Sequence, residues 1–147
     1  MAFKPYRGGN KMFKIEWWTK KASTAFTQNA LVYEVEDGTY IVPADATSGN
    51  LIGIILRAVT SSSSDYASNT KVPVLVPISP NAEIIALIGS GTAAATMEGS
   101  YYDLVDSVSI DLGNQSKKVI LFHKYISATK AVIKINAQAA HANVATT

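Results

Sequence analysis

Short apolar runs with a two-residue period recur along this chain, separated by clusters of Gly, Pro, Asp, Asn and Ser. The run NALVYEVEDGTYIVP at 29–43 is representative, because apolar and polar residues alternate on both sides of Asp37-Gly38. This is the pattern of a β-hairpin with a tight turn. No long stretch has the period of an amphipathic helix. The chain is therefore expected to be all-β, a single small barrel or sandwich of eight or nine short strands with an extended N-terminal arm.

Length and charge divide the chain into three expected segments. A total of 147 residues is enough for one domain with a real core. Residues 1–27 form a basic, aromatic N-terminal arm, 28–136 the β-barrel or sandwich domain, and 137–147 an Ala-rich flexible tail. Residues 1–21 carry six Lys or Arg against Glu16 alone, whereas the remainder is mildly acidic. Such asymmetry is typical of a segment that meets a separate partner.

The segment KMFKIEWWTKK at 11–21 alternates apolar and charged residues with the period of a strand. Two interpretations stay open. It is either the first strand of the protein's own sheet, or an extended arm that pairs with the edge of a partner's sheet.

The segment PADATSG at 43–49 interrupts a strand-like run and offers Asp45, Thr47 and Ser48. It is interpreted as a corner between two strands, not as a site. The following run NLIGIILRAVT at 50–60 is almost continuously apolar, as in a strand buried on both faces. Gly53 within it predicts a bulge or a close backbone approach.

The segment KVPVLVPIS at 71–79 is a strand that contains Pro73 and Pro77. Proline has no N–H for a sheet ladder, so this strand is expected at an edge or beside a gap in a barrel. No internal repeat is evident in the sequence.

A search for chemistry finds no catalytic constellation. The chain has no cysteine, and His123 and His141 lack the spacing of a metal site. Glu34 and Glu36 are interpreted as a solvated strand face. The glycines of GSGTAAA at 89–95 lack the lysine of a phosphate loop, and this segment is interpreted as a turn. Neither an enzyme, a cofactor nor a metal is expected. Four acidic residues lie close together in the sequence, but their spacing does not match a calcium loop, so they are not expected to bind calcium: Glu98, Asp103, Asp106 and Asp111.

Membrane and nucleic-acid partners are not expected either. No apolar run approaches the ~20 residues that span a bilayer, and the start of the chain lacks the apolar core of a signal peptide. The arm combines basic and aromatic residues, as single-strand binders do. The remainder lacks a basic stripe, however, so direct nucleic-acid binding is not expected.

The order of elements resembles that of a phage protein family. KASTAFTQNALVYEVEDGTYIVPADATSGNLIGIILRAV at 21–59 combines small polar residues, an Asp-Gly hairpin, an Ala- and Thr-rich link and an apolar strand. This pattern is similar to small head decoration (cement) proteins of tailed bacteriophages, including the phage lambda head decoration type. The segments at 89–112 and 118–136 resemble phage virion structural proteins of similar size.

The resemblance implies a non-enzymatic structural protein of the virion, made in the host cytoplasm and located on the capsid exterior. Such proteins bind the outer surface of an assembled capsid and stabilise it by bridging subunits of the major capsid protein, as homotrimers or other homo-oligomers. The arm commonly adds to a capsid sheet. In this sequence the implied contacts are Lys11, Phe13, Lys14, Ile15, Trp17, Trp18, Lys20 and Lys21.

The alternative is a phage tail or fibre protein, or a carbohydrate-binding β module. That function would place aromatic side chains on the barrel surface, where sugar rings could stack. The candidates are Tyr66, Tyr101 and Tyr102.

Overall fold

The computed structural model describes residues 3–7, 12–36, 38–48 and 51–136, and these residues form eleven strands and one short 3-10 helix. The all-β prediction is confirmed. The strand count exceeds the eight or nine expected, partly because β1 (Lys4–Arg7) and β9 (Ser109–Asp111) are too short to display an apolar period. No helix among the described residues is long and apolar enough to cross a bilayer. The predicted tail at 137–147 lies outside the described residues.

Five strands from the first half of the chain form one sheet, in the order β2-β6-β5-β3-β4. A parallel bridge between Lys20 and Ile41 joins the end of β2 to β4, so the sheet curls round into a small barrel. We call it the N-terminal barrel. Its strands are β2 (Phe13–Thr19), β3 (Leu31–Val35), β4 (Tyr40–Pro43), β5 (Leu51–Ile55) and β6 (Lys71–Pro77).

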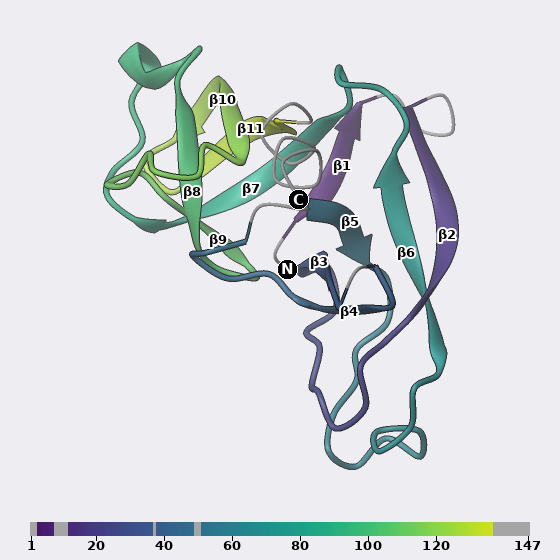
Figure 1. Ribbon diagram of the computed structural model, residues 1–147. Helices are drawn as coiled ribbons and strands as arrows, with labels where there is room; N and C mark the ends of the chain where they lie inside the picture. The colour runs from purple at the N-terminus through teal and green to yellow at the C-terminus, as the bar shows by residue number, and fades with distance from the viewer. Residues whose placement is uncertain (1–2, 8–11, 37, 49–50, 137–147) are drawn as a thin grey trace.

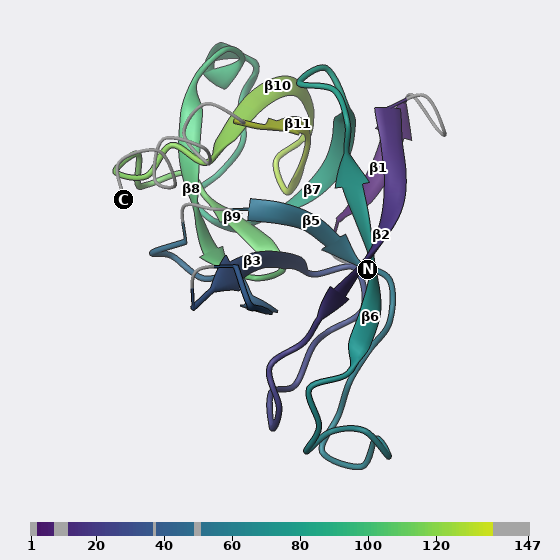
Figure 2. The same ribbon diagram turned by 45° about the vertical axis from the view of Figure 1, so that its right-hand side comes forward.

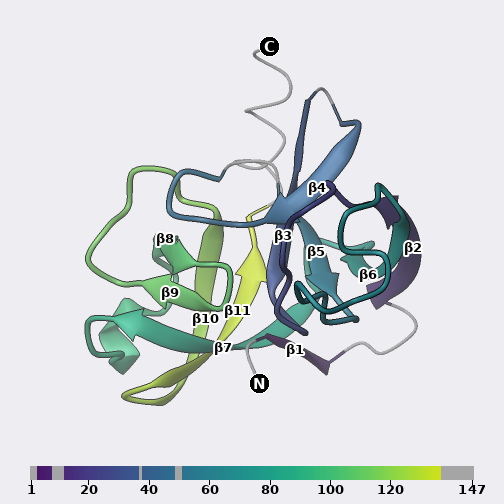
Figure 3. The ribbon, with the colours of Figure 1, turned by 90° about the horizontal axis from the view of Figure 1, so that it is seen from below.

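The second half of the chain forms a closed ring in the order β7-β11-β10-β8-β9, with β9 parallel to β7. We call it the C-terminal barrel, and it lies beside the N-terminal barrel in Figure 3. The short strand β1 pairs antiparallel with β7 at the edge of this ring. The ring and its one helical turn consist of β7 (Glu83–Ser90), η1 (Ala95–Met97), β8 (Tyr101–Asp106), β9, β10 (Ile120–Ser127) and β11 (Lys130–Ile135).

The two barrels repeat one another strand for strand. In each ring the first strand pairs with the fifth, the fifth with the fourth, the fourth with the second and the second with the third, and the third runs parallel to the first. The register is also shared. Lys20 faces Ile41 where the N-terminal ring closes, and Ile88 faces Ile110 at the same place in the other ring.

The shared register holds around the whole ring. Each step below follows a cross-strand pair or moves along one strand, and both circuits use the same steps. The N-terminal circuit is Lys20, Ile41, Glu34, Val32, Gly53, Ile55, Val74 and Glu16; the C-terminal circuit is Ile88, Ile110, Leu104, Tyr102, Ile120, Phe122, Ile133 and Ile84. The chain is therefore a structural tandem repeat, although the paired positions carry different residues.

Each barrel has its own apolar interior. The N-terminal barrel is filled by residues from all its strands, among them Val32, Ile41 and Val74, all fully buried. The larger cluster fills the C-terminal barrel and also includes Phe13, Leu31 and Ile54 from the outer face of the N-terminal barrel. The two barrels are thus joined by continuous apolar packing, which removes this surface from water.

The connection at 56–70 makes the N-terminal barrel different from its repeat, whereas the connection at 20–30 has a counterpart of similar length at 91–100. Residues 20–30 and 56–70 run together to form the protrusion at the bottom of Figures 1 and 2. A bridge between Phe26 and Val59 ties them to each other. The C-terminal barrel has only a tight hairpin between Ser127 and Lys130 at the place of the 56–70 connection.

The expectation that the proline-containing strand lies at an edge is wrong. β6 is an inner strand, paired with β2 on one side and β5 on the other. Pro73 and Pro77 are accommodated because each lies opposite a β2 residue whose own N–H does not point toward β6. On the β5 side, the carbonyl of Pro73 still accepts a 3.0 Å hydrogen bond from the N–H of Leu56.

The prediction of a close backbone approach at Gly53 is confirmed. A Cβ atom at this position would lie 2.2 Å from the carbonyl oxygen of Leu75 on β6. The register of β5 against β3 also shifts beside it, between Val32 and Tyr33. Only glycine allows β5 and β6 to approach this closely.

Candidate functional site

The strand β2 lies at the margin of the molecule in Figures 1, 2 and 3, and among the described residues it meets β4 only at its end, near Lys20, where the barrel closes. It pairs with β6 along its whole length without a register shift, from Phe13 opposite Pro77 to Thr19 opposite Lys71. Of the two interpretations of residues 11–21, the structure thus matches a strand of the protein's own sheet. The free side of this strand defines the candidate site.

Hydrogen-bond directions show which backbone groups β2 leaves open. Ile78 N–H donates to the carbonyl of Met12, and Lys20 N–H donates to the carbonyl of Thr70. Because N–H and C=O groups alternate in direction along a strand, even-numbered residues of β2 face β6. The backbone groups of Phe13, Ile15 and Trp17 therefore point outward, and no strand among the described residues pairs with them.

Two large apolar side chains stand exposed on this strand. Ile15 is 57% exposed and Trp17 is 62% exposed. They lie on the outer face of the barrel, beside Leu75 and Pro73 of β6. A large aromatic and a branched aliphatic side chain in water on one strand form an apolar strip of the kind that partners bury.

The opposite face of β2 carries a small polar network. The Glu16 carboxylate forms a 2.7 Å ion pair with Lys14 Nζ and accepts a 3.0 Å hydrogen bond from Trp18 Nε1. The bond from Lys14 holds the pKa of Glu16 below its ordinary value, with help from Trp18 and against the opposing effect of burial. Glu16 is therefore a stable anion beside the strand edge.

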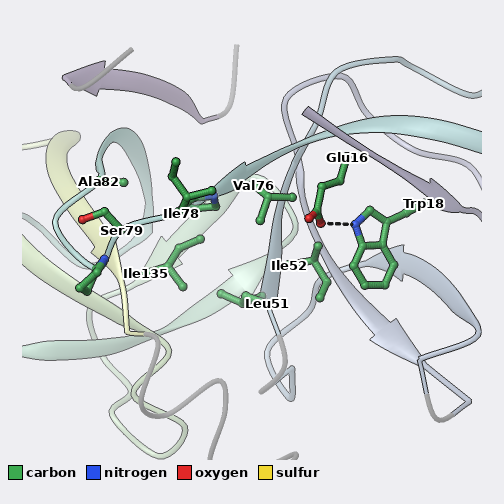
Figure 4. Close-up of a pocket in the computed structure, with 11 residues that line it drawn as sticks. Glu16, Trp18, Leu51, Ile52, Val76, Ile78, Ser79, Ala82 and Ile135 are labelled. Carbon is green, nitrogen blue, oxygen red and sulfur yellow. Dashed lines mark hydrogen bonds between the residues drawn. The ribbon is translucent and has the colours of Figure 1, made fainter. Parts of the chain in front are cut away.

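A groove of about 320 Å³ opens at the mouth of the N-terminal barrel, on the Glu16 side of β2. Figure 4 shows Glu16 and Trp18 on one side, Val76, Leu51 and Ile52 in its centre, and Ile78 and Ile135 on the other side. Its lining is mostly apolar, with Glu16 and Ser79 as polar members. Sequence reasoning missed this groove because its walls come from segments far apart in the chain.

The eight contact residues implied by the resemblance differ in their burial. Phe13 is only 4% exposed and belongs to the core between the barrels, so it is not available to a partner. Lys20 is fully buried. Trp18 is partly buried beside the groove. Lys11 lies outside the described residues.

The remaining four lie at the surface. Ile15 and Trp17 form the apolar strip described above. Lys14 pairs with Glu16, and Lys21 pairs with Glu36 at 2.6 Å. The hydrogen bond to Glu36 raises the pKa of Lys21. The exposed part of β2 is thus predominantly apolar, and its lysines already have acidic neighbours.

Lys20 has a structural role that the sequence did not suggest. Its ammonium donates to the carbonyl oxygens of Ser68 at 2.5 Å, Asp65 at 2.7 Å and Tyr66 at 3.4 Å. The carboxylate of Asp65 is bound in turn by Arg57 and by the hydroxyl of Thr70. These contacts, that of Thr70 foremost, lower the pKa of Asp65 to about 2. The 56–70 connection is therefore fastened to the barrel by the buried Lys20 ammonium and by the partly buried bonds of Asp65.

The segment at 43–49 is a turn between β4 and β5 as far as the described residues extend. The Asp45 carboxylate accepts hydrogen bonds from the N–H and hydroxyl of Thr47 and from the hydroxyl of Ser48. Burial raises the pKa of Asp45, but these bonds outweigh it and leave the pKa lowered. The three side chains satisfy one another, as in an Asx-type turn.

The remaining titratable residues are dispersed. The described residues contain no group of three or more His, Asp or Glu side chains placed to hold a metal ion. His123 Nε2 lies 3.1 Å from a carboxylate oxygen of Glu83. Asp103 is buried and accepts the backbone N–H groups of Lys117 and Lys118. His141 lies outside the described residues.

The three tyrosines of the carbohydrate alternative do not form one surface platform. Tyr102 is 7% exposed and stacks edge-on against Phe122 in the core. Tyr66 donates its hydroxyl to the carbonyl of Ser23 in the protrusion. Tyr101 is exposed on β8.

Comparisons with known proteins assign no family to this chain. No protein-family model matches it, and no curated protein matches it.

Proposed function

We propose that this chain is a non-enzymatic virion structural protein that binds the outer surface of an assembled phage capsid and bridges subunits of the major capsid protein. The resemblance of residues 21–59 to head decoration proteins motivates the proposal. The observation that carries it is the exposure of Ile15 and Trp17 on β2. Such a strip is a suitable anchor for a preformed apolar pocket on a shell.

The structure revises the contact chemistry that the resemblance implied. An extended arm with lysines reaching shell carboxylates would need Lys20 and Phe13, and both are buried. The proposed contact is therefore a rigid strand, with Trp17 as its main anchor and Ile15 beside it. A rigid anchor loses less conformational entropy on binding than a segment that folds at that moment.

The test is co-sedimentation of the purified chain with assembled heads of the phage that encodes it. The chain should pellet with the heads and remain in solution without them. Trp17→Ala should weaken this binding by about thirtyfold, as expected for an aromatic hot spot. Tyr125→Ala is the matched control, because Tyr125 is also an exposed aromatic residue but lies in the C-terminal barrel.

Two results would contradict the proposal in different ways. Equal binding of the Trp17→Ala and Tyr125→Ala variants would show that the strip is not the anchor. Absence of the unmodified chain from the pellet would reject the capsid assignment, and the tail, fibre or carbohydrate-binding alternative would then take precedence.

A further inference from the structure

The tandem repeat supplies a direct comparison for the open edge of β2. The register that aligns Lys20 with Ile88 also aligns Ile15, Glu16 and Trp17 with Glu83, Ile84 and Ile85. In the C-terminal barrel this stretch of the first strand is covered by another strand. β1 pairs with it antiparallel, with Lys4 opposite Ile85 and Pro5 opposite Ile84.

The equivalent stretch of β2 has no such covering strand among the described residues. Its outward backbone groups belong to Phe13, Ile15 and Trp17, and its side chains include the two most exposed large apolar residues of the described chain. Unpaired edges of this kind are the usual places where a strand from another chain is added. The repeat shows that this fold accepts an antiparallel strand at that position.

We propose that the edge of β2 pairs with the same edge of a second copy of this chain, antiparallel across a two-fold axis at Ile15. This inference deepens the proposed function, on which its shell-binding consequence rests. Directly opposed residues of an antiparallel pair lie on the same face of the sheet. The two-fold axis must therefore pass through a residue pair, and the charges on β2 select which one.

Charge complementarity selects Ile15. With Ile15 opposite Ile15, each Lys14 lies opposite Glu16 of the second copy, which gives two attractive cross-strand pairs. Moving the axis to Glu16 would oppose two carboxylates, and moving it to Lys14 would oppose two ammonium groups. Like charges directly opposed destabilise a strand pair.

The hydrogen-bond directions agree with this register. Ile15 has its N–H and C=O directed outward, so the two copies of Ile15 can form a hydrogen-bonded pair on the axis. Phe13 of each copy then lies opposite Trp17 of the other, and their outward groups can also pair. No backbone group of β2 needs to leave β6 for this to happen.

The dimer would also enlarge the proposed shell contact. A two-fold axis perpendicular to the sheet places both copies of Ile15 and Trp17 on the same face. One strand pair buries little area, so the dimer is expected to be weak in solution. Attachment to a shell at two points would strengthen it through effective concentration.

The test combines solution mass with a charge exchange. Sedimentation velocity over about a hundredfold range of concentration should show a monomer converting to a dimer. The single changes Lys14→Glu and Glu16→Lys should each raise the dissociation constant by about tenfold, because each creates two repulsive pairs. An equimolar mixture of the two variants should recover the original affinity, because the heterodimer contains two attractive pairs while both within-strand pairs stay broken.

A backbone variant tests the hydrogen-bonded edge itself. Ile15→Pro removes an outward N–H without removing a bond to β6 and should abolish the dimer. Ile15→Ala, which keeps the N–H, is its matched control and should retain a dimer. Unchanged circular dichroism and melting temperature must accompany each variant, as expected for an exposed side chain.

Three results would overturn the inference: a monomer at every concentration, a variant mixture no tighter than its components, or a dimer unaffected by Ile15→Pro. Head co-sedimentation is measured separately. A monomer that pellets with heads would reject the dimer and leave the proposed function intact. A dimer with the predicted charge exchange that does not pellet would support the strand pairing and reject the capsid role.

Discussion

Lys20 and Ile88 occupy the same position in the two barrels, where the first strand meets the third, yet one is a buried ammonium and the other an aliphatic side chain. Even their backbone bonds match: Lys20 N–H donates to Thr70 at 2.8 Å and Ile88 N–H to Thr129 at 2.9 Å. The difference follows from the segment that connects the fourth and fifth strands of each barrel. Only the N-terminal barrel has the long 56–70 connection, and its carbonyl groups bind the Lys20 ammonium.

Removing that ammonium should destabilise the protein. Lys20→Met keeps most of the side-chain volume but leaves the carbonyl groups of Asp65 and Ser68 without their buried donor. We expect a loss of about 1–3 kcal/mol in the free energy of unfolding, measured by urea denaturation. Lys21→Met is the control, because the Lys21 side chain forms only a solvent-exposed pair with Glu36, and its loss should lower the free energy of unfolding clearly less than the loss of the Lys20 ammonium. Equal losses would show that the ammonium of Lys20 has no special structural role.

Two aromatic residues on β2 should respond oppositely to truncation. Phe13→Ala removes a ring buried between the barrels and should cost about 3–5 kcal/mol of stability. Trp17→Ala removes a ring that is 62% exposed and should change stability by less than about 1 kcal/mol. Thermal and urea unfolding of both variants would check this. A large loss for Trp17→Ala would mean that its role is packing, and the anchor in the proposed function would lose its support.

A methyl group at Gly53 should be poorly tolerated. Gly53→Ala would place Cβ 2.2 Å from the Leu75 carbonyl oxygen, which belongs to the backbone and cannot rotate away. The strands β5 and β6 would have to separate, at a cost of about 1–3 kcal/mol in the free energy of unfolding. Gly113→Ala is the control, because its Cβ would meet only the Asp111 side chain at 3.3 Å. Similar melting temperatures for the two variants would argue against the close approach.

Acid should reduce the stability that Asp65 contributes by holding the 56–70 connection, and it should do so in a defined pH range. Hydrogen bonds from Thr70 and Arg57 lower the pKa of Asp65 from 3.8 to about 2. A carboxyl whose pKa is lowered by folding contributes stability above its unfolded value, and this contribution is lost as pH falls through the folded value. The stability difference between the unmodified protein and Asp65→Asn should therefore be constant well above pH 3.8, begin to fall at about pH 5 and continue to shrink toward pH 2. Urea unfolding at a series of pH values measures it, and a difference independent of pH would contradict the assignment.

The local elements can be predicted from the amino-acid sequence alone. The two-residue period predicted strands because alternate side chains of a strand face opposite sides. The hairpin between β3 and β4 and the close approach at Gly53 follow from the conformations that Gly38 and Gly53 allow. These signals are local, so one sequence contains them completely.

Which strands are neighbours depends on tertiary packing. Proline in β6 predicted an edge or a place beside a gap in a barrel. An inner position is possible because Pro73 and Pro77 form non-hydrogen-bonded pairs with β2, so β2 needs no N–H from either proline. The repeat is not visible in the sequence because ring closure constrains the backbone register far more than the residue identities, so Glu16 lies where Ile84 lies in the other barrel. Likewise, alternation predicted that Phe13, Ile15 and Trp17 share a face. Only packing of the C-terminal barrel against part of that face buried Phe13 and left Ile15 and Trp17 in water.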